Sequence, residues 1–140
     1  MITSFWFAIY TLFFVYLSIN VIKARKQTKT SLGQGTDFLL HQAIRAHANF
    51  FEYTPMFLIG MYVCETRIAA SPIIITLLAL LFLAGRMLHF YALTKHEVYK
   101  DGNLVNSIKP RVISMGITFF CLLSLSALAI FKVFVIIIKY

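Results

Sequence analysis

The residues of this chain that are best suited to chemistry lie within its apolar stretches. Four polar residues recur every three or four positions in one such stretch: His41, Arg45, Asn49 and Glu52. At 100° per residue, this spacing places all four on one face of an α-helix. Arg86 and His89 stand about one helical turn apart in a second apolar stretch. The spacing therefore predicts two polar helix faces that can pair with one another.

Two interpretations of these polar faces fit the residue types. A charged group at the centre of a membrane span costs about 2.5–3.5 kcal/mol, so these charges are expected to face protein or trapped water. In a structural interpretation, hydrogen bonds hold the helices together, Arg45 pairs with Glu52, and Arg86 clamps Glu52. In a binding interpretation, an excess of guanidinium groups forms an anion site. The excess consists of Arg25, Arg45, Arg86 and Arg111 against Glu52, with Asp37 near the edge.

Membrane-spanning helices are the elements that must position these residues. Hydrophobic residues make up 60% of the 140 residues, charged residues make up 13%, and the mean hydropathy is +0.82. That charged share is about half of the 25% typical of soluble domains. The pattern predicts an all-α membrane protein with a single domain over residues 1–140. Its four-helix bundle has spans at about residues 2–22, 36–65, 72–93 and 110–138.

Two features of the predicted spans concern their packing. The second span is expected to score poorly by hydropathy because of its polar face. It should bend at Pro55, where one backbone hydrogen bond is lost. Trp6 and Tyr10, towards the outer end of the first span, are typical of side chains that anchor a helix at the membrane interface.

The basic residues are distributed in a way that predicts the membrane orientation. The first connection carries Lys23, Arg25, Lys26 and Lys29, and the third carries Lys95, Lys100, Lys109 and Arg111. The second connection has only Arg67, and no basic residue precedes the first span. By the positive-inside rule, the first and third connections face the cytoplasm and both termini face outward.

Several polar residues are expected to lie outside any site. The net charge of +8 is confined to short segments between apolar runs, which favours membrane topology over nucleic-acid binding. The sequence therefore predicts no nucleic-acid partner. His96 and Glu97 are expected to be solvated residues of the third connection. The four histidines and two cysteines are scattered without ligand spacing, so the sequence predicts no metal site.

The polar stretch of the second span carries a family resemblance. Residues 45–55, RAHANFFEYTP, resemble the signature of the MAPEG family, the membrane-associated proteins in eicosanoid and glutathione metabolism. Residues 32–35, LGQG, are similar to a run in its bacterial members, and residues 85–89, GRMLH, and Arg111 also fit. The resemblance covers essentially the whole chain. It implies a homotrimer of four-helix subunits in a bacterial inner membrane, with glutathione bound between neighbouring subunits near the cytoplasmic face.

The same resemblance implies a role for each site residue. Arg111 matches the arginine that activates the thiol, and Arg86 matches a structural clamp on the polar layer. His47 is expected to touch either the ligand or a neighbouring helix. Glutathione contacts are implied for Arg45, Asn49, Glu52, Tyr53 and His89, and for Arg25 of an adjacent subunit.

The implied activity is a glutathione transferase or peroxidase that acts on lipophilic electrophiles delivered from the membrane. Arginines can grip the carboxylates of glutathione, Glu52 can receive its ammonium, and a guanidinium favours the thiolate over the thiol. Leu93 and Met115 stand where some catalytic relatives have tyrosines, so binding is better supported than turnover. The alternative is a non-catalytic trimer of the same family that binds lipid or acts as a scaffold.

Overall fold

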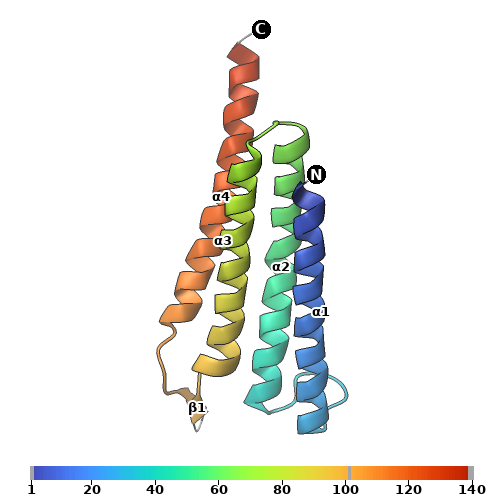
Figure 1. The fold of residues 1–140 in the computed structure, drawn as a ribbon. Helices are drawn as coiled ribbons and strands as arrows, with labels where there is room; N and C mark the ends of the chain where they lie inside the picture. Colours follow the sequence, from blue (N-terminus) through green and yellow to red (C-terminus); the bar gives the residue numbers. More distant parts are fainter. Residues whose placement is uncertain (1, 101, 139–140) are drawn as a thin grey trace.

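The computed structural model describes residues 2–100 and 102–138, which form a bundle of long helices (Figure 1). The long helices are α1 (Ile2–Thr28), α2 (Phe38–Thr66), α3 (Pro72–Tyr91) and α4 (Lys109–Ile138). A π-helical turn, η1 (Ala92–His96), extends α3. An antiparallel pair of two-residue strands, β1 (Tyr99–Lys100) and β2 (Asn103–Leu104), precedes α4. The predicted all-helical architecture is confirmed.

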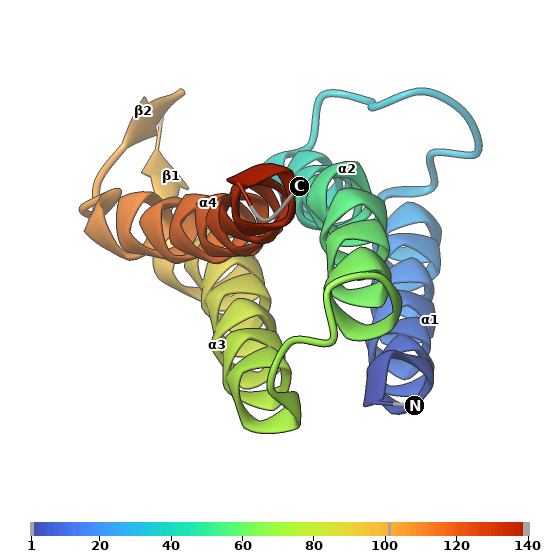
Figure 2. The same ribbon diagram turned by 90° about the horizontal axis from the view of Figure 1, so that it is seen from above.

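Three helical segments are long and apolar enough to cross a membrane. They are α1, α4, and α3 together with η1. The 29-residue α2 also has the length to span a bilayer, because it measures about 44 Å at 1.5 Å per residue. Because of its polar face, α2 is less hydrophobic than the other three segments. Since α2 packs against α1, α3 and α4 (Figure 2), it belongs to the same integral membrane bundle.

The helix ends follow local sequence signals. α1 continues six residues beyond its predicted end and carries Arg25 on its last turn. α2 starts after Asp37, whose carboxylate accepts a hydrogen bond of 2.7 Å from the Leu39 N–H. α2 runs on through Pro55 as one helix. Pro72 opens α3 at a position where no backbone N–H is needed.

Aromatic side chains fill the core between α1, α2 and α3. The Phe57 and Phe82 rings stack with centroids 4.0 Å apart, and the Tyr10 hydroxyl donates a 2.9 Å hydrogen bond to the Ala79 carbonyl. Trp6 and Tyr10 are 5% and 1% exposed. The prediction that these two residues are interfacial anchors is therefore wrong. The Tyr10 hydroxyl can be buried because it finds a backbone acceptor within the bundle.

Candidate functional site

A cavity of about 570 Å³ lies between α2, α3 and α4, towards the end of the bundle that carries the strand pair. Four of the predicted site residues line it together: Arg45, Asn49, His89 and Arg111. The rest of its lining is mostly apolar and includes Leu93 and Met115. Residues that are up to 74 positions apart in the sequence, from Arg45 to Phe119, thus meet in one pocket with a polar and an apolar side.

Arg86 does not line this cavity but contacts two of its lining residues, Asn49 and Met115. It is 2% exposed, and its guanidinium donates to the Asn49 side-chain oxygen and to the Thr118 hydroxyl. It also donates to the Ser114 carbonyl at 3.4 Å and to the Met115 sulfur at 3.6 Å. The guanidinium carbon lies 5.4 Å from the centre of the Tyr53 ring. The prediction that Arg86 clamps Glu52 is wrong, because Arg86 instead ties α3 to Asn49 on α2 and to α4.

The orientation of His89 is set by Ser114. His89 is 5% exposed, and its Nδ1 lies 3.0 Å from the Ser114 hydroxyl oxygen. That hydroxyl donates its hydrogen to the Arg111 carbonyl at 2.7 Å. A serine hydroxyl has one hydrogen, so His89 Nδ1 must be the donor of the pair. In the neutral imidazole, Nε2 is then left as a hydrogen-bond acceptor.

Arg45 and Glu52 form the ion pair expected within α2. The guanidinium and carboxylate are 3.6 Å apart, and their side chains are 57% and 46% exposed. Of this pair, only Arg45 lines the cavity, and Glu52 lies about two turns further along the helix. The carboxylate is accessible beside the cavity rather than within it.

Glu97 is a site residue that the sequence reasoning missed. Its side chain is fully buried, and one carboxylate oxygen accepts hydrogen bonds of 3.2 Å from both Arg111 and the Tyr99 hydroxyl. Burial raises the pKa of Tyr99, and the adjacent Glu97 carboxylate adds to that shift. Gln42 on α2 donates to the Glu97 carbonyl at 2.8 Å. The prediction of a solvated Glu97 is therefore wrong, because η1 folds the chain back against the bundle. The available signal was an acidic residue among the basic residues of the third connection, which it shares with Asp101.

The remaining predicted residues lie outside the cavity in this single chain. Tyr53 lies beside Arg86, with its ring 6.0 Å from that of Phe119. Arg25 donates to the Gly33 carbonyl at 3.0 Å and to the carbonyls of residues 30 and 31, so it fastens the α1–α2 connection. His47 contacts α1 through the Ser18 hydroxyl at 3.1 Å.

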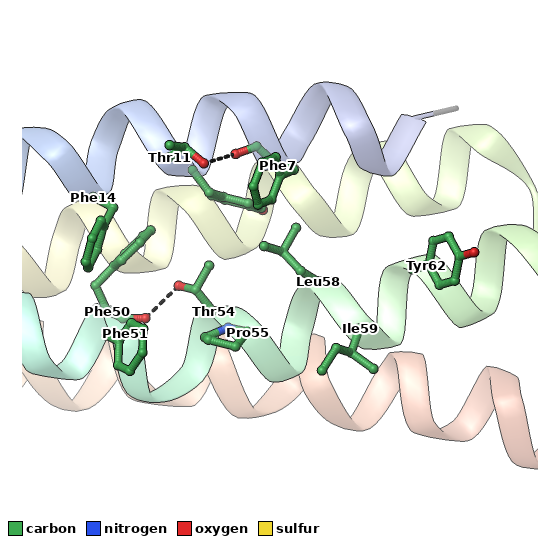
Figure 3. Close-up of a pocket in the computed structure, with 11 residues that line it drawn as sticks. Phe7, Thr11, Phe14, Phe50, Phe51, Thr54, Pro55, Leu58, Ile59 and Tyr62 are labelled. Atoms are coloured by element: carbon green, nitrogen blue, oxygen red, sulfur yellow. Dashed lines mark hydrogen bonds between the residues drawn. The ribbon is translucent and has the colours of Figure 1, made fainter.

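A second cavity, of about 450 Å³, opens between α1 and α2 (Figure 3). Its lining is largely aromatic and aliphatic, with Phe14, Phe51 and Leu58 among its side chains. The Thr11 and Thr54 hydroxyls donate to carbonyls of their own helices at 2.8 and 2.6 Å. This cavity therefore presents mainly carbon and suits an apolar chain.

Comparison with known proteins agrees with these features. The model of the MAPEG family matches residues 3–131 of this chain. The chain is also similar to the inner membrane protein YecN of Escherichia coli strain K12 and to that of strain O6:H1. Each match is 27% identical over 100 residues and covers 71% of this chain and 75% of the relative.

Proposed function

This chain belongs to the MAPEG family, and from that premise we propose that it binds glutathione in the cavity between α2, α3 and α4. The bound thiol would be presented as a thiolate to lipophilic electrophiles, which makes the protein a transferase or peroxidase. The observation that carries the proposal is the convergence of Arg45, Asn49, His89 and Arg111 on one pocket.

The cavity fits the size and chemistry of the tripeptide. A volume of about 570 Å³ falls within the range of roughly 300–1,000 Å³ common for small-molecule sites. Arg45 can pair with a ligand carboxylate, and Asn49 can hydrogen-bond a peptide group. Glu52, accessible beside Arg45, can receive the ligand ammonium. The apolar wall that includes Leu93 suits the electrophile.

Arg111 is the residue assigned to activation of the thiol. A guanidinium stays protonated at neutral pH, so it cannot act as a base, but its positive charge favours the thiolate. Water takes the thiol proton. In a conjugation, the thiolate sulfur forms a bond to the electrophilic carbon as the bond from that carbon to its leaving group breaks. In the reduction of a peroxide, the sulfur forms a bond to oxygen as the oxygen–oxygen bond breaks and the alcohol leaves. A second glutathione then reduces the resulting sulfenic acid, which gives glutathione disulfide and water. Glu97 holds the Arg111 guanidinium at the wall of the cavity.

The complete site is assigned to a homotrimer in a bacterial inner membrane. Arg25 lies away from the cavity of its own chain, so it would reach glutathione only from an adjacent subunit. The name of the relatives from Escherichia coli supports the inner membrane. The basic first and third connections support a cytoplasmic location for the site and an outward location for both termini.

Thiolate absorbance tests the proposal directly. Detergent-purified protein should give an ultraviolet thiolate signal with glutathione at neutral pH, where the free thiol is mostly protonated. Arg111→Ala should lower the thiolate-to-thiol ratio at least about tenfold, because a neighbouring cation is lost. Lys109→Ala is the matched control, since Lys109 is an exposed cation at the start of the same helix, outside the cavity. If the unaltered protein neither binds glutathione nor forms thiolate, the enzyme assignment fails.

A non-catalytic trimer that binds lipid is the second candidate function. The apolar cavity of Figure 3 favours it. Leu93 and Met115 in the lining of the larger cavity also favour it, because neither side chain can donate a hydrogen bond to a thiolate. Glutathione binding without a thiolate signal would support this function over the enzyme.

A further inference from the structure

A third cavity, of about 220 Å³, lies between α1, α2 and the α3–η1 segment, at the same end of the bundle as the strand pair. We call it the lysine cavity, since Lys23 of α1 and Lys95 of η1 both line it. Side-chain amides of Asn20, Gln27 and Gln42 are also part of its wall. None of the described residues that line it is acidic. It shares no lining residue with the cavity assigned to glutathione.

The two lysines bring uncompensated positive charge to this cavity. Neither Lys23 nor Lys95 forms an ion pair with another residue in the described ranges. This contrasts with Arg45 and Arg111, each of which has its own carboxylate. Two cations from different helices suit an anionic ligand better than a neutral one. Two of the amides in the wall already donate to backbone carbonyls, Asn20 to Tyr16 at 2.9 Å and Gln42 to Glu97 at 2.8 Å, so the lysines carry the expected attraction.

The side chains of α1 that line the lysine cavity change from aromatic at Tyr16 to cationic at Lys23. Tyr16 and Lys23 lie on the same side of that helix, and Gln27 follows one turn later. The distance along the helix axis from Tyr16 to Gln27 is about 16 Å at 1.5 Å per residue. At the deep end, the Tyr16 ring meets Phe90 with centroids 5.5 Å apart. Ala24, which is 4% exposed, adds a small apolar side chain to the wall next to Lys23.

We propose that the lysine cavity binds the phosphate group of an anionic phospholipid. Lys23 and Lys95 would hold the phosphodiester, and the aromatic level at Tyr16 would meet the start of the acyl chains. A free phosphate would satisfy the lysines but would leave the aromatic end without a partner. Basic pockets between membrane helices at the cytoplasmic face are suited to anionic headgroups. The site is independent of glutathione binding at the other cavity.

Lipid-dependent stability tests this site with a charge-matched control. The purified protein is titrated with short-chain phosphatidylglycerol, phosphatidylcholine or inorganic phosphate, and the midpoint of thermal unfolding is followed. Lys23→Gln/Lys95→Gln removes both cations of the cavity. Lys26→Gln/Lys100→Gln is the control. It removes one exposed cation from α1 and one from β1, which follows η1 in the chain, and neither lysine lines the cavity. All four lysines are exposed, so both double variants should fold, and each single variant can be measured in the same way.

Phosphatidylglycerol should stabilise the original protein and the control more than phosphatidylcholine does. For Lys23→Gln/Lys95→Gln, its apparent affinity should fall about tenfold or more, because each lysine near a lipid surface contributes to the attraction. Equal effects of the two double variants would overturn the proposal, since the attraction would then be a general property of the basic face. Stabilisation by inorganic phosphate through the same two lysines, at a similar affinity, would also overturn it and assign the cavity to free phosphate.

Discussion

Gly85 on α3 packs closely against α4 beside the cavity proposed to bind glutathione, and it allows a quantitative test of the packing. A Cβ atom added at residue 85 would lie 2.9 Å from Cγ2 of Ile117 and 3.4 Å from the Ser114 carbonyl oxygen. The first distance is about 0.6 Å short of an ordinary carbon–carbon contact of about 3.5 Å. Overpacking of this kind costs about 1–3 kcal/mol. We expect Gly85→Ala to lower the free energy of unfolding by about 2 kcal/mol.

The same substitution should also weaken the cavity. Separation of α3 from α4 at residue 85 lengthens the contacts of Arg86 and His89 with Ser114, which are 3.4 and 3.0 Å in the structure. Glutathione affinity should therefore fall together with stability. The free energy of unfolding can be measured by circular dichroism in mixed detergent micelles. The affinity for glutathione can be measured by calorimetric titration.

Gly116→Ala is the matched control for Gly85→Ala. Gly116 lies on α4 and lines the cavity. A Cβ atom at residue 116 meets no heavy atom within 4 Å. This variant should be as stable as the original protein or slightly more stable, because alanine favours a helix over glycine. If Gly85→Ala were as stable as Gly116→Ala, the close α3–α4 packing and the reasoning built on it would be refuted.

Two further substitutions test the polar groups around the cavity. Arg86→Met should destabilise the bundle by about 1–3 kcal/mol for each of the buried Asn49 and Thr118 oxygens, because it leaves them without their donor. The exposed Arg67→Met should change stability by less than about 0.5 kcal/mol in the same detergent titration, and equal effects would contradict a structural Arg86. Glu97→Gln should raise the thiolate-to-thiol ratio of bound glutathione several-fold, because removing a nearby negative charge favours the thiolate by on the order of 1 kcal/mol. An unchanged or lower thiolate absorbance would indicate that Glu97 acts mainly by holding Arg111 in place.

Sequence periodicity predicted that Arg45 and Asn49 share a helix face, whereas the site roles of His89 and Arg111 came from the family resemblance. The spacing of Arg45 and Asn49 identifies one face of a helix, and the apolar segments on either side require that face to be covered. The structure confirms that both residues, with His89 and Arg111, line one pocket. A helix period determines which side chains share a face whatever the rest of the fold does, which explains why this part of the prediction succeeded.

The pairing of polar side chains between different helices could not be predicted in the same way. The sequence suggested Glu52 as the partner of Arg86, whereas the structure pairs Arg86 with Asn49 and Thr118. The partner of Arg86 depends on the rotation of α3 relative to α2 and α4. Residue spacing within one helix does not determine that rotation. Glu97 was missed for a related reason, since a five-residue π-helical turn decides whether its side chain points to water or to Arg111.

The charges around the cavity are largely compensated within the chain. Arg45 has Glu52 at 3.6 Å and Arg111 has Glu97 at 3.2 Å, so each pair contributes little net charge. Arg86 accounts for the surplus, because its guanidinium contacts no carboxylate among the described residues. Among these three arginines and two carboxylates, the surplus is therefore the single positive charge of Arg86.

That surplus bears on whether one subunit can form a complete glutathione site. Glutathione in its thiolate form has two carboxylates and a thiolate against one ammonium, a net charge of two negative units. The surplus from Arg86 leaves one of these units uncompensated. Arg25 is a suitable source of the missing charge, because its hydrogen bonds in the described structure go only to backbone carbonyls. Since Arg25 lies outside the cavity of its own chain, charge balance favours a site completed by Arg25 of a neighbouring subunit.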